Sequence, residues 1–196
     1  METSIDKIIN IQTFDSLPDL FENNRLYSHG QNKYFNDRKY FHVIWNLLHL
    51  LSVEYPDNPT EQQKLSLVDF IKNFKKFSCG SCSKRKVSNE NENEINVAIL
   101  SKHNFIQFLI DYHKNTNASI RRFDVNNNMI DYTVDIIIQK YKDSDYKTYF
   151  KTIYDVDVEK LIIDANFNLL YDKLIHIKQI IRAQENIEII FSHKLN

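Results

Sequence analysis

The two cysteines of this chain stand three residues apart, as Cys79-Gly80-Ser81-Cys82. They are the only cysteines among 196 residues, so no other thiol of the chain is available for a structural disulfide. Thiols at this spacing can close into a small disulfide that exchanges with the thiols of a substrate. The pair therefore predicts redox chemistry, with half of a zinc site or two inert cysteines as the alternatives.

The residues around the pair favour different roles for the two thiols. Ser78 is a candidate N-cap for a short helix that would extend to about Val87 and place Cys79 in its first turn. Backbone N–H groups and the helix dipole favour a thiolate there. Cys82, one turn later, would be the less exposed, resolving thiol. The basic run at 84–86 either favours the thiolate or forms a solvated helix face.

Two pairs of residues at helical spacing accompany the cysteines. Trp45 and His49 stand four residues apart, as do His113 and Asn117, so each pair shares one face of a helix. By itself, each pair is typical of a hydrophobic core in which a buried polar side chain is hydrogen-bonded. Gathered near a dithiol, these aromatic, imidazole and amide groups are what a stacked, hydrogen-bonded planar cofactor requires. We expect no metal, because histidines at a zinc-finger spacing are lacking.

In their order and spacing, these residues resemble the Erv/ALR sulfhydryl oxidases. The resemblance covers roughly residues 38–123 and rests on four segments: Trp45-Asn46-Leu47-Leu48-His49, Tyr55-Pro56-Asp57, Phe70-Ile71-x-x-Phe74-x-Lys76-Phe77-x-Cys79-x-x-Cys82 and His113-x-x-x-Asn117. It implies a small helical bundle that binds FAD and oxidises dithiols. Large DNA viruses encode members of this family, and the heavy use of Asn, Ile, Lys and Tyr in this chain fits an AT-rich genome.

The resemblance also implies a role for each matched position. FAD would lie inside the bundle with its isoalloxazine ring beside Cys82. Cys79 would accept electrons from a dithiol of a client protein, Cys82 would pass them to the flavin, and oxygen would receive them as hydrogen peroxide. Arg122 fits a basic position of the family better than Arg121, and a solvated basic pair is the alternative. The implied cofactor-binding residues are Trp45, His49, Tyr55, Cys82, His113, Asn117 and Arg122.

Three positions depart from the family pattern. Phe41-His42 stands where the family has Gly-Arg, Ser78 replaces a Pro, and Lys114 replaces an Asn. The missing Arg removes one expected cofactor contact, and the sequence does not decide whether His42 replaces it. The chain also lacks the second cysteine pair of many cellular members, so Cys79 would react directly with its client, as in viral members.

The spacing of apolar residues predicts the helices that must position these groups. It indicates one helix over 37–54, a second that starts after a Thr60/Gln63 capping box and extends to about Phe77, a third over 78–87 and a fourth that opens at Ser101. Residues 88–94 are polar without a period, which predicts an exposed loop. Four helices joined by short loops predict a small bundle. A thioredoxin-like reductase, which needs strands around its CxxC, is disfavoured.

After residue 123 the sequence predicts further helices without recognisable chemistry. Residues 129–141 form a helix or, at 132–138, a strand. One long helix over 157–183 carries an apolar stripe at heptad-like spacing, which packs either within the chain or against a second copy in a homodimer. The stripe consists of Ile163, Phe167, Leu170, Leu174, Ile177 and Ile181. The predicted organisation is an N-terminal extension (1–35), an all-α, Erv-like four-helix FAD-binding bundle (36–123) and a helical C-terminal region for packing or dimerisation (124–196).

The composition narrows the class of protein and its partners. Hydrophobic residues at 42% supply a core, two Gly and three Pro favour helices, and a net charge of −1 gives no case for nucleic acid or a membrane surface. No run approaches the roughly 20 apolar residues of a membrane span, and the N-terminus lacks signal-peptide features. We expect a protein of the host cytoplasm and the virion, with client dithiols and oxygen as partners. A non-catalytic interaction protein that retains the bundle is the competing hypothesis.

Overall fold

The structure is a computed structural model that describes residues 33–74, 92–120, 132–142 and 145–194. These ranges contain helices and no strand, which confirms the predicted all-α fold and disagrees with a thioredoxin-like one. None of their helices is long and apolar enough to cross a membrane. The helices are α2 (Lys33–Glu54), α3 (Glu61–Phe74), α5 (Glu92–Ala98), α6 (Lys102–Ile120), α7 (Val134–Lys142), α8 (Asp145–Tyr154), α9 (Val158–Ile163) and α10 (Leu169–Lys194).

Side-chain caps fix the starts of α3 and α6 where the sequence predicts them. The backbone N–H of Thr60 donates to Gln63 Oε1 at 2.9 Å, and the N–H of Gln63 donates to Thr60 Oγ1 at 3.2 Å. At α6, the N–H of Asn104 donates to Ser101 Oγ at 3.3 Å. These bonds satisfy N–H groups of the first turn that lack an intrahelical acceptor. The predicted capping box and the predicted start of α6 are therefore confirmed.

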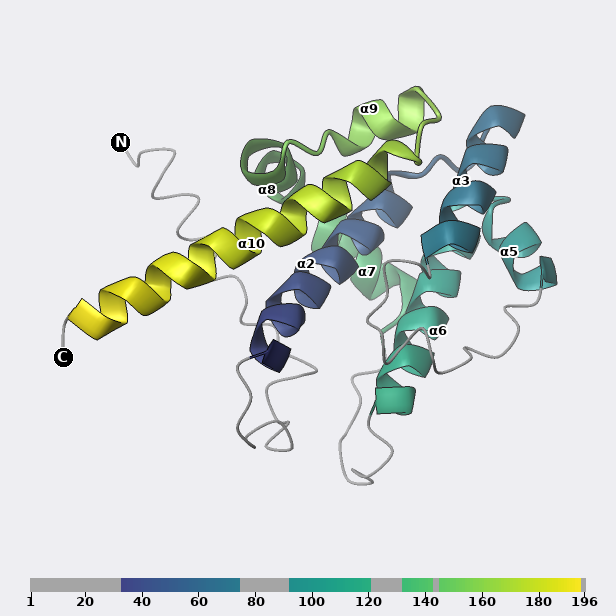
Figure 1. Cartoon of the computed structure of the whole chain (residues 1–196). Coiled ribbons are helices and arrows are strands. Elements are labelled where there is room, and N and C mark those ends of the chain that lie inside the picture. Colours follow the sequence, from purple (N-terminus) through teal and green to yellow (C-terminus); the bar gives the residue numbers. More distant parts are fainter. Residues whose placement is uncertain (1–32, 75–91, 121–131, 143–144, 195–196) are drawn as a thin grey trace.

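Helix α2 is the centre of the fold. Figure 1 shows α10 running alongside it and α7 behind it, with α3, α5 and α6 to one side. Every residue from Leu47 to Val53 is buried, which is the signature of a helix covered on several faces. A single hydrophobic core contains side chains from all eight described helices or their ends. The helices after residue 132 thus share a core with those that carry the predicted site residues.

The predicted single helix over 157–183 is wrong, because the chain breaks between α9 and α10. Ala165 adopts a left-handed conformation with φ of 49°. The N–H of Asn166 donates to the carbonyl of Leu161 at 3.0 Å, and the N–H of Ala165 donates to that of Ile162 at 3.1 Å. This pair of bonds is a Schellman helix end, which a Gly usually marks. Because an Ala and not a Gly stands at position 165, the residue type does not predict this helix end.

The apolar stripe of the C-terminal region packs within this chain. Its first predicted member, Ile163, is 77% exposed at the end of α9 and does not belong to it. The other five members lie in the common core, each at most 3% exposed: Phe167, Leu170, Leu174, Ile177 and Ile181. A contact between two copies is therefore not what buries these five side chains.

At two further places the structure differs from what the local sequence pattern indicated, because tertiary contacts outweigh local preference. The predicted loop over 88–94 is wrong at residues 92–94, which begin α5; Ile95 and Ala98 are buried one turn apart, where α5 contacts α6. The segment at 132–138 is helical from Val134 onward rather than a strand, and the N–H of Ile136 donates to Thr133 Oγ1 at 3.3 Å as an N-terminal cap. Helix α8 has no counterpart in the predicted elements.

Candidate cofactor site

Three of the predicted site residues meet where α2 faces α6, and we call them the Trp–His cluster: Trp45, His49 and His113. The rings of Trp45 and His113 stack with their centroids 3.8 Å apart and their planes 4° apart. The ring of His49, one turn after Trp45 on α2, lies 6.1 Å from that of Trp45 and 5.5 Å from that of His113. The structure therefore brings the Trp45/His49 pair of α2 together with His113 of α6.

The two imidazoles of the Trp–His cluster share a hydrogen bond. His49 Nε2 and His113 Nδ1 are 3.3 Å apart, so one of them donates to the other. Burial, and secondly the positive charge of Lys140, lower the pKa of His49 to about 3. His49 is therefore neutral at pH 7. Its second ring nitrogen, Nδ1, is also buried and has no hydrogen-bond partner among the described residues.

We expect the buried, neutral His49 to make the stability of the fold depend on pH. Its pKa is about 3 in the folded chain against an ordinary value of 6.5, so the unfolded chain binds more protons between these values. The free energy of unfolding therefore falls as the pH falls below about 6.5, with a contribution from His49 of about 2 kcal/mol by pH 5. Urea unfolding measured from pH 7.5 to pH 5 should show this slope, and His49→Gln should flatten it.

His176→Gln is the matched control for this prediction. His176 is exposed on α10, so its removal should leave the wild-type dependence on pH nearly unchanged. A His49→Gln variant that retained the full wild-type slope would show that His49 is not held neutral by burial.

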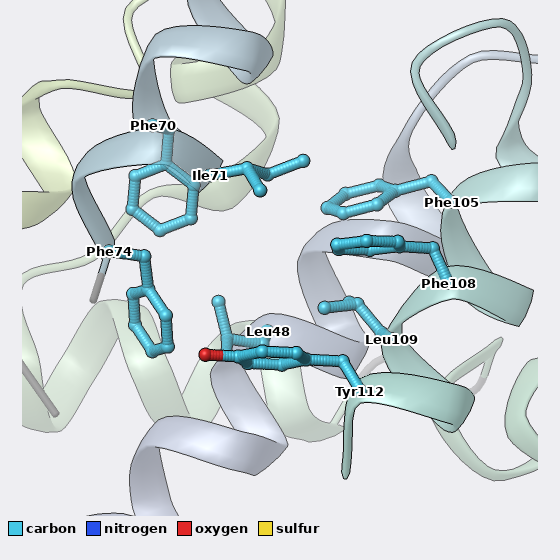
Figure 2. Close-up of a pocket in the computed structure, with 8 residues that line it drawn as sticks. All are labelled: Leu48, Phe70, Ile71, Phe74, Phe105, Phe108, Leu109 and Tyr112. Carbon is cyan, nitrogen blue, oxygen red and sulfur yellow. The ribbon is translucent and has the colours of Figure 1, made fainter. Parts of the chain in front are cut away.

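An apolar pocket lies beside the Trp–His cluster, and Figure 2 shows side chains of α3 and α6 facing each other across it. We call it the apolar pocket; it is lined by Leu48, Phe70, Ile71, Phe74, Phe105, Phe108, Leu109 and Tyr112. Tyr112 joins it to the cluster, because its ring lies 5.8 Å from that of Trp45. The rings of Phe108 and Tyr112 are parallel to within 4°, with centroids 6.0 Å apart. The pocket therefore adjoins the cluster through Tyr112.

The cysteine pair follows closely in the sequence after the end of α3, which lines this pocket. Phe74 lines the pocket and ends α3, five residues before Cys79. A chain of that length spans at most about 18 Å. The cysteines themselves and the predicted helix over 78–87 lie outside the described residues.

Several other predicted site residues also fall outside the described side chains. Asn117 belongs to α6, one turn after His113, and His42 belongs to α2; the structure describes their backbone and not their side chains. Cys79, Cys82, Arg122 and the basic run at 84–86 lie wholly outside it. Their roles stay predictions.

Tyr55 lies apart from the Trp–His cluster, although both were expected to line one pocket. It follows α2 ten residues after Trp45, which is about 15 Å along a helix axis. It is fully buried, and its hydroxyl donates to the carbonyl of Ile99 at 3.0 Å. Its ring packs edge-on against that of Phe105, which lines the apolar pocket. Tyr55 thus supports the pocket through Phe105.

Two residues of the site region, Tyr141 and Tyr112, were not among the predicted site residues. The hydroxyl of Tyr141 donates to Asn46 Oδ1 at 2.5 Å, and the Tyr141 ring stacks on His49 with centroids 6.0 Å apart. Tyr141 belongs to α7, far from α2 in the sequence, and no local pattern indicates this contact. Tyr112, by contrast, was recognisable, because it adjoins His113 on the apolar side of the predicted fourth helix.

Within this helical protein, stacked indole and imidazole rings lie beside an apolar pocket, and such groups are typical of sites for planar cofactors. Residues 42–135 match the model of the Erv1 / Alr family, which supports the family resemblance found in the sequence. Members of the family are generally flavoproteins with thiol oxidase activity. No solved structure matches the chain.

The described residues offer groups that the ring systems of FAD could contact, but the apolar pocket is too small for these rings as it stands. The Trp–His cluster offers aromatic surface and, at His49 Nδ1, a buried polar atom that a cofactor atom could satisfy. The apolar pocket has room for about one water. An isoalloxazine ring there requires side chains such as Phe74 and Tyr112 to move. No group of three or more His, Cys, Asp or Glu side chains in the described ranges could hold a metal ion.

Proposed function

We propose that the protein is an FAD-dependent sulfhydryl oxidase that forms disulfides in client proteins. The Trp–His cluster carries the proposal, because it gathers the predicted cofactor-binding residues of two helices in a chain whose only cysteines form a CxxC pair. A purely structural cluster would leave His49 Nδ1 buried without a partner among the described residues, at a cost of about 1–3 kcal/mol. A cofactor hydrogen bond would remove this cost.

The thiol chemistry requires only the CxxC pair and a client dithiol. A client thiolate attacks the sulfur of Cys79, which breaks the Cys79–Cys82 disulfide and releases Cys82 as a thiolate. A second client thiolate then attacks the client sulfur of the mixed disulfide and releases Cys79. The client loses two electrons and two protons, and the CxxC pair holds them as two thiols. When bound, FAD supplies the two-electron link from this dithiol to oxygen, which leaves as hydrogen peroxide.

The other proposed site residues bind and orient the cofactor. The rings of Trp45 and His113 offer stacking surface, and neutral His49 offers one hydrogen bond without adding charge to the site. Asn117 and Arg122 complete the proposed set from α6 and the segment that follows it. The missing family Arg, where Phe41-His42 stands, supports the second candidate function, a bundle that serves as an interaction protein without oxidase activity.

The visible absorption spectrum of the purified protein tests the proposal. We expect the bands of a bound flavin, which should bleach when a small dithiol is added in a sealed cell and recover when oxygen is admitted. A colourless protein that takes up no added FAD would contradict the proposal and favour an interaction protein. A bound flavin that the dithiol does not bleach would indicate a bundle that binds the cofactor without oxidase activity.

We further propose client proteins with paired thiols, molecular oxygen and a second copy of the chain as partners. The apolar stripe of the C-terminal region does not supply a dimer interface, since its five buried members already pack within the chain. A homodimer would need another surface, and light scattering of the purified protein measures the oligomeric state directly.

A further inference from the structure

We propose that Tyr141 is a positioning residue of the cofactor site and holds His49 and Asn46 in place on α2. The inference rests on the proposed function. It extends that function to a residue beyond the part of the chain that matches the family model, which ends at residue 135. The C-terminal helices would then contribute directly to cofactor binding as well as to the core.

One side chain of α7 contacts α2 at two positions. The hydroxyl of Tyr141 donates to Asn46 Oδ1 at 2.5 Å, and its ring lies on that of His49, with centroids 6.0 Å apart and planes 28° apart. Asn46 directly follows Trp45, and His49 lies one turn further along. Tyr141 therefore contacts α2 at two positions within the turn that follows Trp45.

The contact extends through His49 to the rest of the cluster. Tyr141 packs on His49, His49 Nε2 pairs with His113 Nδ1 at 3.3 Å, and His113 stacks on Trp45. Because an aromatic neighbour restricts the tilt of the imidazole, Tyr141 also sets the direction of the buried Nδ1 atom of His49. That atom is the polar group which the cofactor would use.

The surroundings of Tyr141 suit a fixed orienting role. It is 1% exposed, and burial raises the pKa of its hydroxyl, so the hydroxyl keeps its proton and continues to donate to Asn46. The ammonium of Lys140 lies 4.9 Å from the centroid of the Tyr141 ring and is the charge that helps to lower the pKa of His49. Helix α7 thus supplies both a ring and a positive charge to the surroundings of this imidazole.

The test measures the dissociation constant of FAD from the apoprotein, by quenching of flavin fluorescence, together with the absorption maximum of the bound flavin. Tyr141→Phe removes the hydrogen bond to Asn46 and keeps the ring, and should weaken FAD binding about threefold. Tyr141→Leu removes the ring as well and should weaken it about tenfold. Both variants should shift the absorption maximum.

Tyr154→Phe and Tyr154→Leu are the matched controls. Tyr154 is equally a buried tyrosine, 2% exposed on α8, and its hydroxyl lies 3.3 Å from that of Tyr149, away from the Trp–His cluster. Its variants should lower the melting temperature and leave FAD affinity and the spectrum within twofold of wild type. Should the Tyr141 variants behave in the same way, Tyr141 is a core residue alone and the inference is overturned.

Two further outcomes separate this inference from the function on which it rests. A wild-type protein that binds no FAD overturns both. If Tyr141→Leu does not fold, Tyr141→Phe and Asn46→Ala test the inference instead, and each should weaken FAD binding. The double variant should bind FAD no more weakly than the weaker-binding single variant, because both substitutions remove the same hydrogen bond. Independent, additive losses would show that the bond does not position the site.

Discussion

Replacement of either cysteine by serine should abolish dithiol oxidation while leaving FAD bound. Cys79 and Cys82 are the only thiols of the chain, so nothing can substitute for the one that is removed. The expected loss in turnover is at least about a thousandfold, the scale seen when an enzyme loses its nucleophile. Only Cys82→Ser should markedly alter the charge-transfer absorption of the flavin, because Cys82 is the thiol proposed to lie beside the isoalloxazine ring. Oxygen consumption and the visible spectrum measure the two effects.

Ser81→Ala is the matched control, since it changes the same segment without touching a thiol. It should retain wild-type turnover and wild-type absorption. Full activity in Cys79→Ser or in Cys82→Ser would remove the CxxC pair from the mechanism and with it the proposed function.

Removal of residues 132–196 should prevent the remaining helices from forming a stable fold. The deleted part supplies the five buried side chains of the apolar stripe, Phe167 and four residues of α10, all packed in the common core. Their burial is worth roughly 7–15 kcal/mol, which is comparable to the whole stability of a typical domain. Thermal unfolding followed by circular dichroism should show no cooperative transition in the shortened chain. A cooperative transition at the wild-type temperature would mean that the bundle is independent of its C-terminal region.

A pair of isoleucines on α10 tests the same packing in the full-length chain. Ile177 is fully buried, and Ile175, two residues away, is 50% exposed. Ile177→Ala should lower the free energy of unfolding by about 2–5 kcal/mol, whereas Ile175→Ala should change it by less than about 0.5 kcal/mol. The reverse order would show that Ile175, and not Ile177, lies on the packed face of α10, and would contradict the packing described above.

The sequence alone was sufficient for the local elements of the first part of the chain. Thr60 with Gln63, and Ser101, mark the starts of α3 and α6, because a cap depends on groups within one helical turn. The spacing of apolar residues places α2 and α6 for the same reason. The residues of the Trp–His cluster were identifiable because each pair sits at i and i+4. Their chemistry follows from residue type, and so does that of the cysteine pair.

The start of α5 and the break between α9 and α10 could not be predicted from the sequence in the same way. Ala165 ends α9 in a left-handed conformation that Gly usually marks, so the local pattern predicted an uninterrupted helix. Residues 92–94 read as a loop by composition, but the burial of Ile95 and Ala98 makes them helical. In both places, contacts with other parts of the chain outweigh the weak local preference.

The tertiary structure alone decided how the elements combine. The sequence determined which residues can do chemistry and which local segments are helical, because helix caps and periodicity act over one or two turns. It did not determine that α10 packs into the core of the bundle, or that Tyr141 bonds to Asn46 across 95 residues. Such contacts depend on which apolar faces meet when the whole chain collapses, and no pattern within a single helix specifies its partner.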